Sequence, residues 1–472
     1  MATRDSATIT NRSQQTLGGF MRILFVTPHV GRKSDMQYVR TWQMEPLTIA
    51  TLAALTPSDV EIEYVDERLG ERIDYTIHRD LVIITVETYT AKRSYEICAE
   101  CREHGLPTLI GGYHVMLLPQ EAQKYGDSIM VGFAEPLWEE MISDLRKGKL
   151  KPLYVQDRTV KYPFVIPRRD IFGGRNYFNL HCVETGRGCP LTCEFCSITA
   201  VTGATYLARS IDRILEDIRS LKGNNIFLVE DNFVGNKRHA KELLRAMIPL
   251  KINWVGQGTL NMANDEELLE LMKASGCAGV LIGFESLKRE TLMAMNKPIN
   301  TRFDYEKSIK QMHRYGIALY GTFIFGYDTE SVEDIRLTVE KAIDFGIFMA
   351  AFNHLLPFPG TPTHERLKAE KRLVYDKWWL SPEFRFGEVP FHPKSMSRER
   401  LHEECLRARE RFYSVSSILR RGVENIQGNC GSLKKIGAYT WINYLLRREV
   451  AEKDGLPLGN HPFVPKPNER GP

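Results

Sequence analysis

The sequence predicts an α/β protein in which a doubly wound parallel sheet precedes a partial (β/α)6 barrel and a helical C-terminal region. Between residues 21 and 150, short apolar segments alternate with segments of helical pattern. A second series of six such units begins near Val183, without the seventh and eighth units of a closed barrel. Apolar strands that alternate with helices are typical of parallel sheets covered on both faces.

The first series is expected to contain five strands and two helices. The strands are 22–28, 60–65, 81–86, 108–112 and 128–132, the last of which is the final strand, and the helices are 46–55 and 91–105. The segment 60–65 alternates with period two, whereas 81–86 is apolar throughout. Ligands of such sheets lie beyond the carboxyl ends of the strands, where the chain carries Thr85, Thr88, Gly111, Gly112 and His114.

The second series is predicted to have six strands, at 183–186, 225–230, 254–258, 279–284, 318–325 and 349–355. Its helices are expected at 210–221, 237–247, 265–275, 305–315 and 331–345. The tail, with Trp378, Trp379 and Trp441, is predicted to be helical and to cap the barrel. The expected division is a leader at 1–20, a first domain at 21–150, a linker rich in Pro, Arg and Tyr at 151–180, a barrel at 181–375 and a cap at 376–472.

Composition and charge limit the classes of function. The 472 residues are 43% hydrophobic and 26% charged, which is ordinary for a globular protein. A net charge of +4, from 63 basic and 59 acidic residues, is too balanced to indicate a nucleic-acid partner. No apolar run reaches the ~18–20 residues that span a bilayer. Residues 1–20 are polar and unlike a secretory signal, so we expect a disordered leader and a cytoplasmic protein.

Cys189, Cys193 and Cys196 form a C-x3-C-x2-C motif. Three closely spaced thiolates can ligate three irons of a [4Fe–4S] cube, which leaves the fourth iron open to a substrate or cofactor. A structural zinc site, whose fourth ligand Cys182 could supply, and incidental thiols are the alternatives. Nine cysteines, an odd number without a secretory signal, argue against disulfides.

The cysteine motif and the strand–helix series that follows it resemble the radical S-adenosylmethionine (SAM) superfamily over residues 181–375. The segment 230–233 resembles the family's acidic motif after the second strand, and 283–286 resembles the fourth-strand motif that meets SAM. Residues 321–326 match the fifth strand, and 357–362 match the loop after the sixth. The resemblance implies that the open iron chelates SAM and that an electron from the cluster breaks a C–S bond to release a carbon radical.

Residues 21–150 resemble the Rossmann-like cobalamin-binding domain that precedes the barrel in class B radical SAM methyltransferases. The matching segments are 111–114, 119–121 and 132–138. The chain lacks a D-x-H-x-x-G motif, so no histidine is positioned to ligate cobalt, and Phe133 stands where the subgroup usually has Glu. The domain is therefore expected either to hold cobalamin with a vacant or water-filled lower face, or to keep the fold and bind nothing.

The resemblance also implies roles for residues near the cluster. Phe195 would cover the cluster and face adenine, or only pack in the core. Glu285 and Ser286 would meet ribose hydroxyls or a cationic amine, or Glu285 would be a structural acid at a strand end. Three further polar residues are candidates for the cavity wall: Gln257, Asn232 and Arg209. The arginine would pair with the SAM carboxylate unless it is exposed at a helix entry.

In the first domain, Gly111 and Gly112 would let the backbone approach cobalamin, or would only form a tight turn between strand and helix. Thr85, Thr88 and His114 would hydrogen-bond the nucleotide tail of cobalamin. A single histidine is, however, often satisfied by local partners.

Three functions are compatible with the sequence. The first is a cobalamin-dependent radical SAM methyltransferase, in which a 5′-deoxyadenosyl radical takes hydrogen from an unactivated carbon. The second is a cobalamin-independent radical SAM enzyme that closes a ring, rearranges its substrate or transfers another SAM fragment. The third is a zinc-bound scaffold or sensor. Both enzymes would need a [4Fe–4S] cluster, SAM and an electron donor such as flavodoxin or ferredoxin. The apolar strand ends suit a small hydrophobic substrate, such as a lipid or tetrapyrrole.

Overall fold

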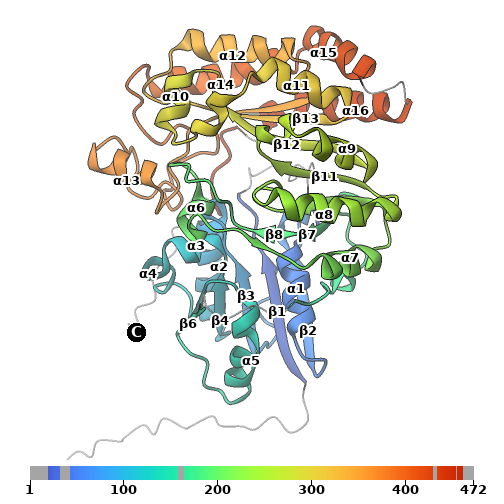
Figure 1. Cartoon of the computed structure of the whole chain (residues 1–472). Helices are drawn as coiled ribbons and strands as arrows, with labels where there is room; N and C mark the ends of the chain where they lie inside the picture. Colours follow the sequence, from blue (N-terminus) through green and yellow to red (C-terminus); the bar gives the residue numbers. More distant parts are fainter. Residues whose placement is uncertain (1–19, 32–42, 158–163, 429–432, 453, 461–472) are drawn as a thin grey trace, which may run out of the picture.

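The computed structural model describes residues 20–31, 43–157, 164–428, 433–452 and 454–460 of the chain. The predicted leader lies outside these residues except for Phe20. Two six-stranded parallel sheets form the molecule, and Figure 1 shows the N-terminal sheet below the second one. The predicted order, a doubly wound sheet followed by a second parallel sheet and C-terminal helices, is confirmed.

The N-terminal sheet has the strand order β2-β1-β3-β4-β5-β6, and all neighbours are parallel. Its strands are β1 (Met21–Thr27), β2 (Val60–Asp66), β3 (Leu81–Thr85), β4 (Thr108–Gly111), β5 (Ser128–Val131) and β6 (Leu153–Val155). Its helices are α1 (Leu47–Leu55), α2 (Ala91–Glu103), α3 (Tyr113–Leu117), α4 (Pro119–Ala122) and α5 (Trp138–Arg146). The chain reverses direction across the sheet between β1 and β3, where such sheets bind their ligands.

The sixth strand corrects two sequence-based expectations. Residues 128–132 were expected to form the final strand and 151–180 a linker, but β6 pairs in parallel with β5 inside that linker. Only the central Tyr154 of β6 is buried, while Leu153 and Val155 are exposed. A three-residue edge strand after Lys-Pro carries too little apolar pattern to be recognised in the sequence.

The second sheet has the order β14-β13-β12-β11-β10-β7 and is parallel throughout. Its strands are β7 (His181–Glu184), β10 (Asn225–Val229), β11 (Asn253–Gly258), β12 (Cys277–Glu285), β13 (Ala318–Phe325) and β14 (Met349–His354). The covering helices are α7 (Ile211–Ser220), α8 (Lys237–Met247), α9 (Glu266–Ala274), α11 (Tyr305–Arg314) and α12 (Val332–Asp344). β7 and β14 stay apart as edges in the described sheet, so the barrel is partial, as predicted.

The inner face of this barrel is open. On β13, Leu319, Phe323 and Phe325 point outward and are buried under the helices. The alternate residues Tyr320 and Thr322 point to the inner face and remain half-buried. Side chains fill the interior of a closed, packed barrel, so half-buried inward residues indicate space for a ligand.

The C-terminal region differs from the predicted cap. Helices α14 (Arg398–Phe412), α15 (Val415–Gly428) and α16 (Leu433–Glu452) follow the barrel, and α14 packs against α12 and β14. Residues 376–397 contain no helix, and Trp378 and Trp379 lie in the core of the N-terminal domain instead of on the barrel. Trp379 Nε1 donates a hydrogen bond of 2.9 Å to Glu121 of that domain. No described helix is long and apolar enough to cross a membrane.

Candidate active site

The three motif cysteines lie on one loop. It runs from β8 (Gly186–Arg187) to α6 (Ser197–Thr202), whose N-cap is Cys196. The Cys196 amide donates to the Cys193 carbonyl at 3.2 Å, which folds the loop back on itself. Cys193 is buried, and Cys189 and Cys196 are half-buried. The loop thus presents three thiols from one short, ordered segment.

Distant parts of the barrel hold this loop in place. Asn296, after β12, donates from Nδ2 to the Thr192 carbonyl at 2.7 Å. Arg366, on α13 (Pro362–Ala369), donates to Glu194 Oε1 at 2.9 Å, and Thr363 donates to the same oxygen at 3.1 Å. The sequence motif could not identify these partners, because they follow the cysteines by more than a hundred residues.

The segment 230–233, at the end of β10, contacts the loop directly. Asp231 accepts a hydrogen bond of 2.7 Å from the Gly188 amide, next to Cys189. Asn232 is buried, and its Nδ2 lies 3.6 Å from Cys189 Sγ. Its Oδ1 is buried and has no hydrogen-bond partner among the described residues, so it remains available to a ligand beside the loop.

The end of β12 holds a buried ion pair. Lys297 Nζ lies 2.6 Å from Glu285 Oε1 and donates a second bond of 2.8 Å to the Gly283 carbonyl. A Cβ at Gly283 would lie 2.7 Å from Lys297 Nζ, so only glycine fits above the pair. Ser286 is turned away from this pair and donates to Glu330 Oε1 at 2.9 Å. The sequence analysis identified Glu285 as a candidate but did not identify Lys297.

The loop fits a [4Fe–4S] cube with one open iron. Burial raises the pKa of the Cys193 thiol to about 12, so the thiolate requires a nearby cation, which cluster iron provides. Cys182, the fourth ligand of the zinc alternative, lies instead on β7 with its Sγ 4.0 Å from Met44 Sδ. Within the described ranges, no three His, Cys, Asp or Glu side chains are grouped closely enough to hold a single metal ion. A cube spaces its sulfur ligands more widely than a single zinc ion does.

Arg209 and Phe195 lie close to the loop with protein partners of their own. Arg209 forms an ion pair with Glu184 at the end of β7, and its guanidinium lies over the Phe164 ring. Phe195 is half-buried and packs against the barrel core. For Phe195 this contact favours the core-packing alternative. The Arg209 side chain is 8% exposed, so it is not the exposed arginine that was the alternative to a role at SAM. Gln257 on β11 is half-buried on the inner face, where it was expected.

Arg187 joins the cysteine loop to the N-terminal domain. Its guanidinium stacks 4.4 Å above the Phe133 ring and donates to Glu135 Oε1 at 2.5 Å. The phenylalanine that departs from the subgroup pattern therefore serves as the platform for a cation of the barrel.

The N-terminal residues predicted to bind cobalamin have mixed roles. His114 is completely buried, with Nδ1 3.3 Å from Thr88 Oγ1 and Nε2 3.2 Å from Glu121 Oε1. His114 and Thr88 are therefore satisfied locally. Gly112 has φ +123°, and a Cβ there would lie 2.6 Å from the Val86 carbonyl oxygen, so the turn itself requires glycine.

Gly111 and Thr85 keep accessible surface at the strand ends. Both residues are half-buried. A Cβ at Gly111 would make only ordinary contacts, at 3.7 Å from Met130. Thr85 Oγ1 donates a long bond of 3.4 Å to the Val26 carbonyl, which leaves the hydroxyl oxygen able to accept.

Five ionisable side chains at the strand ends of the two domains are surrounded by protein atoms but keep some accessible surface, and none of the five was predicted. Glu87 is exposed, yet burial among protein atoms raises its carboxyl pKa to about 7. Burial likewise raises the pKa of Tyr89, Tyr113 and Tyr320, and lowers that of His354 to about 3, although all four are only half-buried. The protein surroundings therefore disfavour the charged forms of these side chains, although solvent still reaches them.

Tyr113 lies near both the N-terminal sheet and the cysteine loop. Besides burial, the charges of Asp231, Glu87 and Cys196 raise its pKa. The tyrosine at the end of β4 therefore lies between a carboxyl of the N-terminal sheet and the thiols of the barrel.

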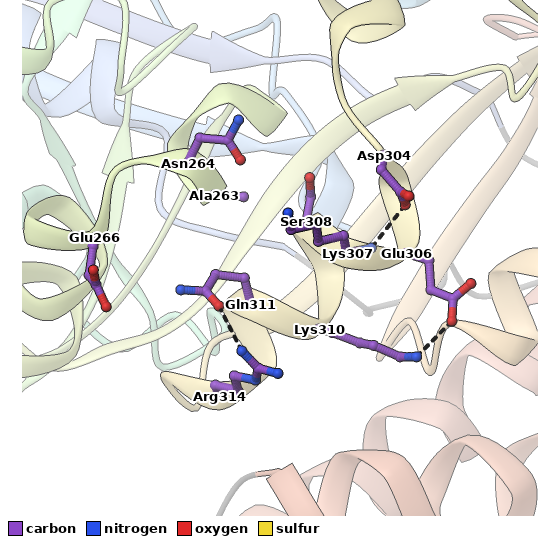
Figure 2. Close-up of a pocket in the computed structure, with 10 residues that line it drawn as sticks. All are labelled: Ala263, Asn264, Glu266, Asp304, Glu306, Lys307, Ser308, Lys310, Gln311 and Arg314. Carbon is purple, nitrogen blue, oxygen red and sulfur yellow. Dashed lines mark hydrogen bonds and ion pairs between the residues drawn. The ribbon is translucent and has the colours of Figure 1, made fainter.

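A second hollow lies on the outside of the barrel. A groove of about 680 Å³ lies among η6 (Leu260–Asn264), α9 and α11, and Figure 2 shows ten residues that line it. Within this lining Lys310 Nζ lies 2.6 Å from Glu306 Oε1, and Arg314 donates a hydrogen bond to Gln311 Oε1. No residue predicted for the site lines this groove.

Comparison with known proteins supports this description. The family model of the Radical SAM superfamily matches residues 183–342 of this chain. A bacteriochlorophyllide d C-12(1)-methyltransferase of Chlorobaculum tepidum is 30% identical over 416 residues, which cover 85% of this chain and 88% of that protein. A hopanoid C-2 methylase of Rhodopseudomonas palustris is 25% identical over 350 residues, which cover 71% and 66%.

Solved structures share the arrangement of both domains. The radical SAM methyltransferase TsrM from Kitasatospora setae, solved with cobalamin and a [4Fe–4S] cluster bound, superposes with a TM-score of 0.63 at 16% identity. That match covers 91% of this chain and 99% of TsrM. The cobalamin-dependent SAM radical enzyme OxsB, solved with aqua-cobalamin bound, gives a TM-score of 0.57 at 14% identity and covers 92% and 80%.

Proposed function

Because this chain belongs to the radical SAM superfamily, we propose that it is a cobalamin-dependent methyltransferase that adds a methyl group to an unactivated carbon of an apolar substrate. One observation carries the proposal. Tyr113, after β4 of the N-terminal sheet, lies close enough to Glu87 of that sheet and to Asp231 and Cys196 of the barrel to interact with all three, so the three-thiol loop and the strand ends of the N-terminal sheet adjoin. That arrangement suits two cofactors acting on one substrate.

In this proposal Cys189, Cys193 and Cys196 hold the cluster. Asn232 directs an N–H to the Cys189 sulfur, and its unpartnered Oδ1 is available to the amino group of SAM. The Glu285–Lys297 pair fixes the end of β12 beside these groups. When bound, the cluster supplies an electron for cleavage of SAM and cobalamin carries the methyl group.

The N-terminal sheet would hold cobalamin over the ends of β3 and β4. Gly111, Thr85 and Glu87 offer backbone and polar side chains there. The amide-rich rim of a corrin can donate hydrogen bonds to Thr85 and to the Glu87 carboxyl. His114 and Thr88 support this surface from below, because they bind each other.

The cellular context follows from the same chemistry. A reducing compartment such as the cytoplasm would keep the three thiols available, and a flavodoxin or ferredoxin would deliver the electron. The substrate is a small molecule that fits between the two domains.

Incubation of the anaerobically reconstituted protein with SAM and candidate acceptors tests the proposal. SAM labelled in its methyl group should transfer the label to carbon of the product, and omission of cobalamin should abolish transfer. Turnover that is equal without cobalamin would instead support the second function, a cobalamin-independent radical SAM reaction.

A further inference from the structure

Arg409, on α14, lies at the open edge of the barrel sheet. Its Nε donates a bond of 3.0 Å to the Phe352 carbonyl, and its Nη2 donates a bond of 2.9 Å to Asn353 Oδ1. Both acceptors belong to β14, the edge strand, and both are uncharged. These two bonds fix the orientation of the guanidinium.

The charge of Arg409 is not neutralised by a carboxylate. The other arginines of α14 all form ion pairs with glutamates: Arg398, Arg400, Arg407 and Arg411. Arg409 has no such pair among the described residues, and its Nη1 makes no hydrogen bond to them. A half-buried guanidinium with one free, oriented edge is a ready partner for an oxyanion.

Arg409 lies near residues of both domains. Its charge acts on Tyr89 of the N-terminal domain and on Tyr320 and His354 of the barrel. The Tyr89 ring packs against three other aromatic rings, and its hydroxyl makes no hydrogen bond to a described residue. Two acidic residues lie near this set: Glu449, which acts on Tyr320 and is itself nearly buried, and Glu388, whose backbone contacts His354 and whose carboxylate pairs with Arg398.

Most of the rest of the inner face is apolar, with Gln257 and Thr322 as polar exceptions. The half-buried inward residues of β11, β12, β13 and β14 include Val255, Leu281, Ile324, Met349 and Ala351. A ligand that covers this surface and reaches Arg409 needs an apolar body and an anionic group at one end.

We propose that Arg409 binds a carboxylate of the methyl acceptor, whose apolar body lies along the inner face of the barrel sheet. This assignment rests on the proposed function and adds the class of substrate, an apolar carboxylic acid. An oxyanion could also come from the phosphodiester of cobalamin. We assign the substrate because Arg409 is bound to the edge strand of the barrel, whereas the cofactor surface belongs to the N-terminal sheet.

The test compares pyropheophorbide a, an apolar macrocycle with one carboxylate, with its methyl ester. Equilibrium dialysis against the reconstituted holoprotein gives the two dissociation constants. The free acid should bind about 10- to 100-fold more tightly than the ester, as a charge-assisted hydrogen bond predicts. In Arg409→Gln this ratio should fall to about one.

Two further variants control for misfolding. Asn353→Asp keeps Arg409 but gives its Nη2 a carboxylate as hydrogen-bond partner. The preference for the free acid over the methyl ester should therefore also disappear. Arg411→Gln removes a guanidinium from the same helix, where it pairs with Glu340, and should keep the preference.

Several results would overturn the assignment. They are an equal affinity for acid and ester in the wild type, no binding of either compound, or an acid preference that survives in Arg409→Gln. Loss of cobalt from Arg409→Gln alone would assign the guanidinium to the cofactor. Absence of cobalt from the wild type would overturn the proposed function instead, independently of the affinity ratio.

Discussion

Lys297 Nζ lies 2.6 Å from Glu285 Oε1, and the side chains of both residues are only 7% exposed. Glu285 has φ +62°, a backbone conformation that non-glycine residues rarely adopt. The lysine acts electrostatically on Cys193 and Cys196, so the pair stands beside the cysteine loop. The protein therefore keeps a strained residue and a buried charge pair at the point where SAM is expected.

Replacing the lysine of this pair should destabilise the protein strongly. Lys297→Met leaves the Glu285 carboxylate buried without a partner, which costs about 3–5 kcal/mol. Thermal unfolding of the holoprotein should show a lower midpoint, and Glu285→Gln in the same chain should restore much of it. Lys310→Met removes an exposed pair on α11 and should leave the midpoint unchanged. A midpoint in Lys297→Met equal to that of the wild type would contradict this account of the pair.

The motif cysteines should each be required for iron. Cys189→Ala, Cys193→Ala and Cys196→Ala should each lower the iron content from about four per chain to less than about one. Cys182→Ala is the matched control, because its thiol contacts Met44 and not the loop. Anaerobic reconstitution followed by iron and sulfide analysis makes the comparison. Loss of iron from the control would show that the loop alone does not form the site.

Gly112→Ala should damage the cofactor surface of the N-terminal sheet. The new Cβ would lie 2.6 Å from the Val86 carbonyl in a backbone region that glycine alone tolerates, and we expect a loss of about 1–3 kcal/mol or more. Cobalamin content should fall with it. Gly148→Ala, also at positive φ but with no atom within 4 Å of its Cβ, should cost less. Equal unfolding midpoints for the two variants would show that the close approach at Gly112 is unimportant.

Stability should decrease as the solution becomes acidic, partly because of His313. This imidazole on α11 is buried, and burial lowers its pKa from 6.5 to about 4. Since the unfolded chain takes up the proton first, stability is full above pH 6.5 and is lost as the pH falls toward 4. Over this range the free energy of unfolding should fall by about 3 kcal/mol in total.

Denaturant unfolding between pH 7.5 and pH 5 measures this effect. His313→Leu should flatten the pH dependence, whereas His78→Leu, which changes an exposed histidine, should not. An unchanged slope in His313→Leu would mean that the imidazole does not remain neutral in the folded protein.

Strong, repeated patterns made most of the fold predictable. Apolar strands such as 81–86 and the six-unit series that starts near Val183 lie where expected, because their burial on both faces leaves a clear signal. β6 lacks this signal, since it is three residues long and exposed at both ends. Trp378 and Trp379 were assigned to the wrong domain, because sequence cannot show that a segment after the barrel returns to the first core.

The candidate site was predictable only where its residues are neighbours in the chain. The cysteine motif is local, and Asn232 follows a strand that could be recognised. Lys297, Arg366 and Arg409 reach the site from segments far away in sequence, and their charges resemble those of ordinary surface residues. His114 fits the subgroup pattern, but its side chain is completely buried and lies within hydrogen-bond distance of Thr88 and Glu121.

The central claim is that one chain holds both an iron–sulfur cluster and cobalamin. The most direct test is the iron, sulfide, zinc and cobalt content of protein purified without oxygen and reconstituted with hydroxocobalamin. The account predicts about four irons and about one tightly held cobalt per chain. Four irons without cobalt would contradict the role of the N-terminal domain, and zinc without iron would contradict the enzyme altogether.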